Sequence, residues 1–137
     1  MIVIPQVVAA DILTHAAGEA PIEACGLLLG KGEQVHRCYR MTNTDHSPEH
    51  FSMDPREQFD AARAARARGE TVVAVYHSHP ATPARMSAED IRLAQAPGMR
   101  YVILSLRDPA QPVIRCYILA ADQPEEEPVR IEEQEDE

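Results

Sequence analysis

The sequence predicts an α/β domain built on a mixed β-sheet that is flanked by helices. Short apolar runs typical of buried strands alternate along the chain with segments of helical periodicity, in the order βαββαβαββ. The chain has 137 residues, of which 45% are hydrophobic and 26% are charged. These values are typical of one domain with a hydrophobic core of its own.

The first half of the chain is predicted to form three strands and one helix. Residues 2–4 form a short apolar strand, and apolar side chains recur at helical spacing through residues 7–17. The run at residues 25–30 is apolar and bounded by glycine, which at that length favours a buried strand. A turn at residues 31–33 then leads into a further strand over residues 35–41.

The second half is predicted to contain two helices and three strands, after a polar loop at residues 42–52. The first helix begins at Asp54, whose side chain can cap it, with Pro55 in the first turn. Glu57 is expected to reach back to the cap backbone. The remaining predicted elements are a helix at residues 87–96 and strands at residues 72–76, 101–106 and 113–119.

Acidic residues are concentrated at the C-terminal end of the chain. The net charge is −9, and residues 125–137 account for −7 of it, with eight acidic residues and one arginine. We therefore expect residues 1–124 to form the folded domain and residues 125–137 to form an acidic, flexible tail. Because the body of the chain is nearly neutral, nucleic acid is not expected as a partner.

Membrane insertion and secretion are not expected either. No segment approaches the roughly 18 consecutive apolar residues that a membrane-spanning helix needs. The first residues lack the basic start and the long apolar stretch of a secretion signal. Cys25, Cys38 and Cys116 form no Cys-x-x-Cys pair and are odd in number, which argues against a disulfide framework. These features predict a protein of the reducing cytoplasm.

Two histidines separated by one residue follow the predicted strand at residues 72–76. Side chains two apart on a strand project to the same side, about 6–7 Å apart along the chain, so His77 and His79 can converge on one metal ion. Asp90, at the start of the predicted helix, is a candidate third ligand. Imidazole nitrogen and carboxylate oxygen both suit tetrahedral zinc, and three protein ligands leave a fourth position open for water.

Catalysis at such a site also needs a group that takes a proton from water and passes it to the leaving group. Glu23 is the best candidate because it precedes the buried strand at residues 25–30, although other acids could reach the same end of the sheet. Asp90 has a structural alternative, since Ser87 and Asp90 also match the capping box that begins a helix. The two roles do not exclude each other.

The candidate residues resemble the JAMM (MPN-plus) metalloprotease family, whose signature is an upstream glutamate followed by H-x-H-P-x(6)-S-x-x-D. In this chain the signature falls, without any change in spacing, on Glu23, His77, His79, Pro80, Ser87 and Asp90. The resemblance covers most of residues 1–124, which it implies form a JAMM/MPN-plus catalytic domain. It is closest to small bacterial members that resemble cysteine-releasing hydrolases of sulfur-carrier proteins. It implies an MPN/JAB (cytidine deaminase-like) architecture for the predicted α/β fold.

The resemblance also implies a role for each residue of the signature. His77, His79 and Asp90 would bind Zn2+, which is the implied cofactor. Glu23 would act as the general base and then as the general acid. The hydroxyl of Ser87 would stabilise the tetrahedral oxyanion.

The implied activity is that of a zinc metallopeptidase. It would cut the amide or isopeptide bond after the C-terminal Gly-Gly of a small ubiquitin-like sulfur-carrier protein and release cysteine or a short C-terminal extension. The alternatives are a broader JAMM isopeptidase acting on ubiquitin-like conjugates and a non-catalytic MPN scaffold. A zinc nucleobase deaminase is disfavoured because its H-x-E and P-C-x-x-C motifs are absent. The carrier, the leaving group and the oligomeric state are left open.

Other polar residues are given structural interpretations. Cys25 lies in an apolar strand and is expected in the core, and Ser78 should point away from the two histidines. His46 and His50 fall in the polar loop, where exposure to solvent is expected. One helix carries a basic face that is expected to be solvated: Arg56, Arg63 and Arg66.

Overall fold

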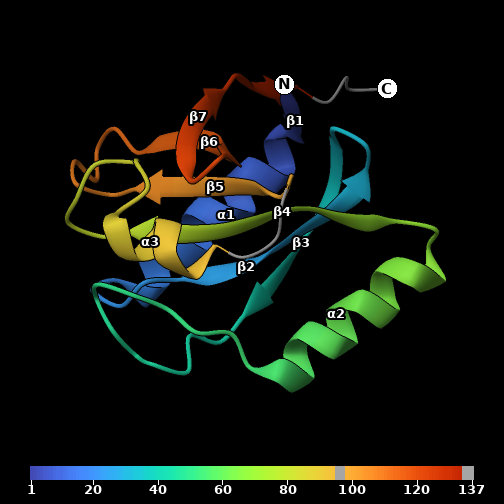
Figure 1. Cartoon of the computed structure of the whole chain (residues 1–137), viewed down its shortest axis with the longest axis horizontal. Coiled ribbons are helices and arrows are strands. Elements are labelled where there is room, and N and C mark those ends of the chain that lie inside the picture. The colour runs from blue at the N-terminus through green and yellow to red at the C-terminus, as the bar shows by residue number, and fades with distance from the viewer. Residues whose placement is uncertain (95–97, 134–137) are drawn as a thin grey trace.

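One mixed β-sheet runs through the molecule, with its strands in the order β7-β6-β5-β4-β2-β3-β1-β8 (Figure 1). The structure is a computed structural model that describes residues 1–94 and 98–133. Within these ranges the strands are β1 (Ile2–Pro5), β2 (Cys25–Lys31), β3 (Gln34–Met41), β4 (Thr71–His79), β5 (Arg100–Ser105), β6 (Val113–Ala120), β7 (Gln123–Glu127) and β8 (Val129–Glu132). β4 pairs with β5 in parallel, and β1 pairs in parallel with β3 and β8, while the other neighbours are antiparallel. The predicted mixed sheet is confirmed.

Helices cover both faces of this sheet (Figure 1). They are α1 (Gln6–Glu19), α2 (Pro55–Ala67) and α3 (Ala88–Leu93). α1 packs on one face, where Ile12 joins a buried cluster with Tyr76 of β4. On the other face α2 packs through Ala61 against Leu29 of β2, and α3 packs through Ile91. In the described ranges no helix is both long and apolar enough to cross a membrane.

Every strand and helix expected from the sequence is present, with its ends shifted by a few residues. α3 ends at Leu93, and the expected continuation toward Pro97 lies outside the described residues. Asp54 caps α2 as expected, since its carboxylate accepts a hydrogen bond of 2.8 Å from the backbone amide two residues later. The expected role of Glu57 is wrong. Its carboxylate accepts hydrogen bonds from the backbone amide and the hydroxyl of Thr42, which ties the start of α2 to the end of β3.

The sequence prediction of a flexible tail after residue 124 is wrong for residues 125–132, which are ordered in the sheet. Residues 125–132 form most of β7 and all of β8, which pair with β6 and β1 at opposite ends of the strand order. High charge obscured the pattern, because acidic side chains of these strands face solvent while their backbones pair and Val129 packs on the core. Residues 134–137 lie outside the described residues, and the assignment of catalysis to residues 1–124 stays a prediction.

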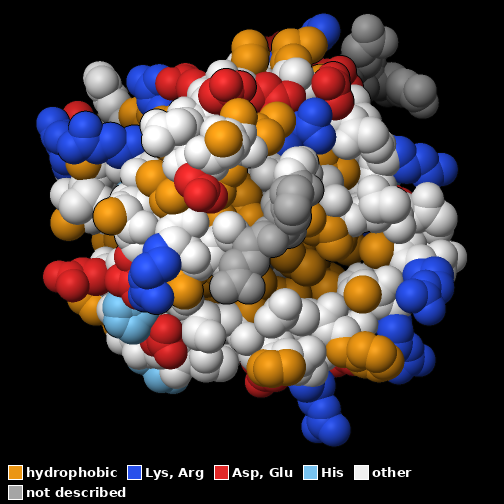
Figure 2. Space-filling view, in the orientation of Figure 1, with side chains coloured by type: hydrophobic (Ala, Val, Ile, Leu, Met, Phe, Trp, Pro, Cys, Tyr) orange, Lys and Arg blue, Asp and Glu red, His pale blue; other side chains and the backbone are white. Residues whose placement is uncertain are grey.

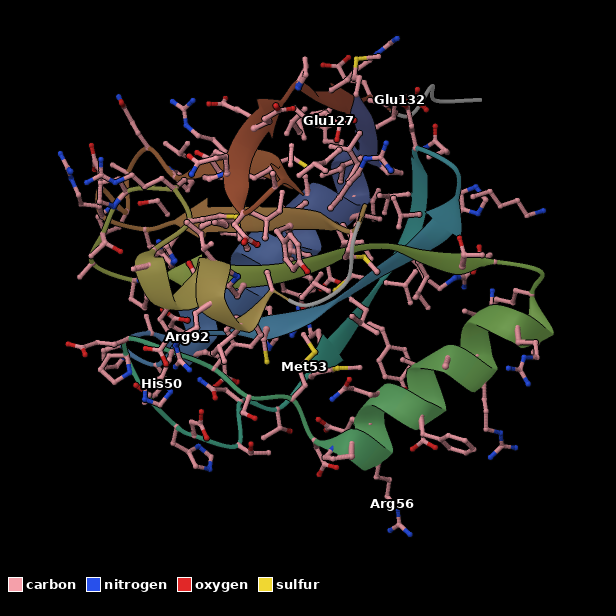
Figure 3. The ribbon with its side chains drawn as sticks, in the orientation of Figure 1. His50, Met53, Arg56, Arg92, Glu127 and Glu132 are labelled. Atoms are coloured by element: carbon pink, nitrogen blue, oxygen red, sulfur yellow. The ribbon has the colours of Figure 1, made fainter. Side chains whose placement is uncertain are left out.

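The two edges of the sheet approach each other. β7 and β8 are consecutive along the chain but occupy opposite ends of the strand order, so the sheet must curve round between them. Figure 2 shows acidic side chains gathered where β7 lies, and Figure 3 labels Glu127 there. The carboxylate of Glu127 is only 10% exposed and accepts hydrogen bonds from Nε of Arg100, at 2.9 Å, and from the amino terminus of Met1. This acidic residue therefore helps to close the fold.

A buried amide, that of Asn43, organises the loop between β3 and α2. Its Nδ2 donates to the backbone oxygens of Glu23 and His50, both at 3.0 Å. Its Oδ1 accepts from the backbone amides of Asp45, at 3.1 Å, and Ser52, at 3.2 Å. Asn43 is 5% exposed, so these four bonds are shielded from water. The side chain holds the loop against the residues that precede β2 and so fixes the position of Glu23.

Replacement of Glu127 by alanine is expected to lower the free energy of unfolding by about 1–2 kcal/mol. Arg100 then loses the nearer of its two carboxylate partners among the described residues, Glu127 at 2.9 Å, and keeps only Glu33 at 3.5 Å. Glu125 is the matched control, since it lies exposed on the same strand. Its replacement by alanine should change the free energy of unfolding by less than about 0.5 kcal/mol. Urea titration of both variants measures the difference, and equal values would contradict the role given to Glu127.

The contribution of Glu127 is also expected to depend on pH. Burial works to raise the pKa of Glu127, but hydrogen bonds from Arg100 and the amino terminus outweigh it and hold the pKa below its ordinary value of 4.5. A carboxyl whose pKa is lowered in the folded state stabilises the fold above its unfolded pKa. The stability difference between the wild type and Glu127→Ala should therefore be complete at pH 7 and shrink as the pH falls below 4.5.

Replacement of Asn43 by alanine is expected to lower the free energy of unfolding by about 2–4 kcal/mol, because it leaves several buried backbone groups without partners. The neighbouring Thr44→Ala removes one exposed hydrogen bond, from the threonine hydroxyl to the backbone oxygen of Ser52, and should cost under about 1 kcal/mol. Denaturant unfolding compares the two. A loss at Asn43 no larger than that at Thr44 would rule out the organising role.

Candidate metal centre

Three side-chain atoms converge at the carboxyl end of β4. His77 Nε2, His79 Nε2 and Asp90 Oδ2 form a triangle in which each pair of atoms is 3.1 Å apart. The three residues are buried, with exposures of 1%, 4% and 8%. Ligands at about 2.0–2.1 Å from a tetrahedral zinc ion lie about 3.3 Å from one another, which is close to the size of this triangle. The three residues could therefore hold one metal ion.

The alternation of side chains along β4 produces this convergence. His77 and His79 project toward the face of the sheet that carries α3, from which Asp90 comes. Ser78 points to the opposite face, as expected, and its hydroxyl oxygen accepts a hydrogen bond of 2.8 Å from the backbone amide of Ala24. The same pairing that ties β4 to the start of β2 thus leaves both imidazoles directed toward α3.

A hydrogen bond sets which nitrogen of His79 faces the other ligands. Nδ1 lies 2.8 Å from the backbone oxygen of Pro83, which is only an acceptor, so Nδ1 carries a proton and the neutral ring has its lone pair on Nε2. That lone pair faces the carboxylate of Asp90 at 3.1 Å. Two acceptors at this distance repel each other unless a proton or a cation lies between them. The donor set therefore fits a metal ion.

The electrostatics of the triangle favour binding of a cation. Burial alone would raise the pKa of Asp90, but hydrogen bonds from His77, and from His79 when its ring carries both protons, outweigh it and hold the pKa well below its usual range. Burial lowers the pKa of His77, which favours the neutral imidazole that binds metals. Burial also acts to lower the pKa of His79, but Asp90 and the carbonyl of Pro83 raise it above its ordinary value. Protons therefore compete with a metal ion at His79.

Ser87 and Asp90 form a capping box at the start of α3. The backbone amide of Ser87 donates to Asp90 Oδ2 at 3.0 Å, and the backbone amide of Asp90 donates to Ser87 Oγ at 3.0 Å. The first bond fixes the carboxylate that faces the histidines. The second occupies a lone pair of the serine oxygen and leaves its hydroxyl proton available to donate. The structural and the chemical interpretations of this pair are therefore compatible, as the sequence suggested.

Glu23 lies beside the triangle because of the register between β2 and β4. These strands are antiparallel, with Cys25 opposite His77. The same register continued by two residues brings Glu23 level with His79. Alternation then turns the side chain of Glu23 toward the face that carries the two histidines.

The carboxylate of Glu23 is buried and incompletely paired. The residue is 3% exposed, and its Oε1 has no hydrogen-bond partner among the described residues. Burial raises the pKa of Glu23 to about 8, with His79 opposing this shift and Asp90 adding to it. An unpaired buried carboxylate oxygen is costly for folding, so Glu23 is a candidate for a chemical role.

An apolar hollow borders the triangle on the side of His77 and Asp90. Phe51, Met86 and Tyr101 contribute to its lining. The ring of Phe51 stacks on that of His77, with centroids 4.7 Å apart. This side of the triangle is therefore predominantly apolar.

A second hollow borders the triangle on the side of His79. Ser87 and Arg85 contribute to its lining, and Arg85 is the basic residue among the described residues that border either hollow. No acidic side chain is among the described residues that line this second hollow. The two hollows therefore differ in character, one apolar and the other with a positive charge.

The structure places the five predicted site residues close together: Glu23, His77, His79, Ser87 and Asp90. The other residues considered in the sequence lie elsewhere or are buried. Cys25 is fully buried in the cluster beneath α2, as expected. His46 is exposed, as expected, but His50 is half-buried and borders the apolar hollow (Figure 3). Its Nδ1 lies 2.9 Å from Asp45 Oδ2. The arginines of α2 are exposed, as expected: Arg56, Arg63 and Arg66.

Sequence analysis missed four residues that shape the site: Asn43, Phe51, Pro83 and Arg85. Two of them left a signal that could have been used. Asn43 comes directly after a strand in a polar loop, where a side-chain amide commonly bonds to the backbone. Arg85 lies in the interval between the second histidine and the serine of the signature. The other two depend on how separate segments pack.

Comparisons with known proteins identify a family and related enzymes for this chain. Residues 5–126 match the family model described as prokaryotic homologs of the JAB domain. A CysO-cysteine peptidase of Mycobacterium tuberculosis is 38% identical over 125 residues, which cover 90% of this chain and 86% of the relative. A desampylase of Haloferax volcanii is 35% identical over 102 residues, which cover 69% of this chain and 73% of the relative.

A solved structure also shares this fold. The solution structure of a protein from Desulfitobacterium hafniense matches with a TM-score of 0.91 and 45% sequence identity, and the match covers 98% of this chain and 94% of that one. All residues of the signature lie within the range matched by the family model. The chain therefore belongs to the family of prokaryotic JAB-domain homologues, and its resemblance to the JAMM (MPN-plus) proteins is confirmed.

Proposed function

We propose that the protein is a zinc-dependent hydrolase that cleaves the amide bond after the C-terminal Gly-Gly of a small ubiquitin-fold sulfur-carrier protein, releasing cysteine or a short C-terminal extension. The observation that carries this proposal is the buried triangle of His77, His79 and Asp90 beside the unpaired carboxylate of Glu23. Membership of the JAB family and the names of the two relatives, a peptidase and a desampylase, support hydrolysis of conjugates of ubiquitin-like carriers.

His77, His79 and Asp90 would hold the ion through two imidazole nitrogens and one carboxylate oxygen, a donor set that suits zinc. Zinc bound there would polarise the scissile carbonyl and lower the pKa of a water molecule toward about 7. The carbonyl of Pro83 would keep His79 in the tautomer that presents Nε2, and the backbone amide of Ser87 would keep the carboxylate of Asp90 in place.

Glu23 would move the proton. It takes a proton from the attacking water and returns it to the leaving amine, which departs more readily when protonated. Burial raises the pKa of Glu23 to about 8, so the carboxyl can both accept and release a proton near neutral pH. Its Oε1 forms no hydrogen bond among the described residues, so this oxygen is not committed to another partner and would be available to the attacking water.

Ser87 would stabilise the negative oxygen that develops on the substrate carbonyl. Its Oγ accepts a hydrogen bond from the backbone amide of Asp90, so the hydroxyl proton can be donated toward the site. Removing one such donor typically slows turnover by about 10²–10³-fold. The capping box fixes the position of Ser87 before substrate arrives, which is the preorganisation that this form of catalysis requires.

The Gly-Gly tail of the carrier would lie in the apolar hollow beside His77. Glycine has no side chain, so an extended Gly-Gly tail would place the least bulk against Phe51 and Met86, which contribute to the lining of this hollow. Its backbone groups would be recognised by strand-like hydrogen bonding, which depends little on sequence. The narrow lining would exclude tails with larger side chains at these positions.

Two other functions remain as alternatives. A broader isopeptidase is favoured by the similarity to the Haloferax volcanii desampylase. The segments that flank the signature are short, which favours a small leaving group over a second protein. A non-catalytic scaffold is disfavoured because all three ligands, the buried acid and the serine are retained.

The three cysteines support the proposed location in the reducing cytoplasm. All of them are free thiols: Cys25, Cys38 and Cys116. Burial raises their pKa values to about 12, 11 and 12, so they are poor nucleophiles and resist disulfide exchange. Chemistry at the site is therefore assigned to the metal ligands and Glu23 rather than to a thiol.

The purified protein is expected to bind zinc stoichiometrically. His77→Ala and Asp90→Ala should lose the metal, because each removes one of three ligands, whereas His46→Ala changes an exposed histidine of the loop and should retain it. Metal content by mass spectrometry and the thermal midpoint with and without a chelator measure both effects. Full zinc occupancy in the Asp90→Ala variant would contradict the assigned ligand set.

The central assay incubates the zinc-loaded protein with carrier proteins that bear a cysteine or a short peptide after Gly-Gly. Mass spectrometry should find cleavage directly after Gly-Gly. Glu23→Gln is expected to retain zinc while losing at least about 10²-fold in turnover, because the amide cannot shuttle a proton. Glu49→Gln, in an exposed loop position, is the matched control and should cleave normally. Failure of the wild type to cut any such adduct would favour the scaffold.

A further inference from the structure

We propose that Arg85 binds the terminal carboxylate of the leaving group and thereby selects substrates in which a free amino acid follows Gly-Gly. The inference rests on the proposed function and deepens it, because the family signature assigns no role to this position. It distinguishes release of a single amino acid from removal of a carrier attached to a protein lysine.

Arg85 is held at a defined place between β4 and α3. Its neighbours Ala84 and Met86 are buried, with exposures of 5% and 8%, while Arg85 itself is exposed. The backbone oxygen of Ala84 accepts a hydrogen bond of 2.7 Å from the hydroxyl of Tyr117 on β6. The two buried neighbours and this hydrogen bond fix the backbone at Arg85, so its side chain extends from a defined position.

The same segment is anchored at two earlier residues. The backbone oxygen of Thr82 accepts a hydrogen bond of 2.6 Å from the hydroxyl of Ser105 on β5. The backbone oxygen of Pro83 accepts from Nδ1 of His79 at 2.8 Å. The second bond joins the segment directly to a residue of the metal triangle, so Arg85 is positioned relative to the reacting centre.

The guanidinium group of Arg85 is free to bind an anion. Within residues 1–94 and 98–133 it forms no salt bridge, in contrast to Arg92, which pairs with Glu89, and Arg100, which pairs with Glu127. The hollow that it lines also contains His79 and Ser87, and its described lining includes no carboxylate. A substrate carboxylate entering this hollow would therefore meet one unpaired positive charge.

The chemistry of the leaving group matches this position. In an amino acid joined to Gly-Gly through its α-amine, the carboxylate carbon lies about 2.5 Å from the nitrogen of the bond to be cut. The carboxylate is therefore close to the metal triangle whenever that bond is in place for attack. Arginine binds carboxylates through two parallel hydrogen bonds, which adds direction to charge.

The alternative leaving group lacks this feature. A lysine side chain joined through its ε-amine carries no carboxylate near the nitrogen, because its own carboxyl group is part of a protein backbone. Arg85 thus supplies an attraction that only a free amino acid or a very short extension can use.

The test compares two synthetic peptides ending in Gly-Gly-Cys, one with a free carboxylate and one with a C-terminal amide. The zinc-loaded wild type is expected to show a kcat/KM about 10–100-fold higher for the acid, the range of a charged hydrogen-bonded pair. Arg85→Gln should lose this preference, and Arg85→Lys should retain part of it. Arg107→Gln, an exposed arginine lining a neighbouring hollow, is the matched control and should keep the full preference.

A binding measurement separates this proposal from the proposed function. In the zinc-loaded Glu23→Gln background, calorimetry should give a dissociation constant about 10–100-fold lower for the acid than for the amide, and Arg85→Gln should equalise the two. Peptides ending in Gly-Gly-Ala repeat the comparison without a thiol that could bind zinc. If no peptide is cleaved by the wild type, the proposed function fails while this binding difference still decides the role of Arg85.

Two results would overturn the proposal. Equal dissociation constants of the Glu23→Gln protein for the acid and the amide peptide would show that no group of the protein binds the terminal carboxylate. An equal loss of binding for both peptides in the Arg85→Gln variant would show that Arg85 contacts the carrier tail instead. Circular dichroism of each variant confirms that the fold is retained.

Discussion

The antiparallel pairing of β2 with β4 is the interaction on which the site depends. It brings Cys25 opposite His77, and the continued register brings Glu23 level with His79. Because strand side chains alternate, a shift of one residue would turn Glu23 to the opposite face of the sheet. Gly26 permits this pairing, since a side chain at that position would collide with the ring of Tyr76. Packing against Tyr76 therefore requires glycine at this position.

One face of the sheet forms a packed core, and the other face carries the candidate metal site. On the face that carries α1, Tyr76 is fully buried and its hydroxyl lies 2.8 Å from Nδ1 of His15. That face is a packed interior with its polar groups paired. On the face that carries α2 and α3, ligand atoms of His77, His79 and Asp90 converge, and Oε1 of Glu23 has no hydrogen-bond partner among the described residues. Unpaired or repelling polar groups are thus found where a metal ion and substrate are expected to complete the structure.

The acidic C-terminal segment adds two strands to the sheet and places charged side chains along its edges. β7 and β8 form the two edges of the strand order, and exposed carboxylates lie on both, Glu125 and Glu126 on β7 and Glu132 on β8. Charges on edge strands oppose pairing with other molecules. Glu127 differs from its neighbours because it is turned inward to Arg100 and the amino terminus. One segment therefore provides both the last contacts of the fold and a surface that resists aggregation.

The sequence by itself determined those features that depend on near neighbours along the chain. Apolar periodicity located the strands and helices from residue 2 to residue 119, and the spacing of His77, His79 and Asp90 indicated the metal site, because alternation and capping are local rules. Only the tertiary structure decided that residues 125–132 join the sheet, since acidic strands carry little apolar signal and are held by backbone pairing with distant partners. The roles of Asn43, Glu127 and Arg85 likewise arise from contacts between segments far apart in the chain, and no local pattern encodes which distant group a side chain will meet.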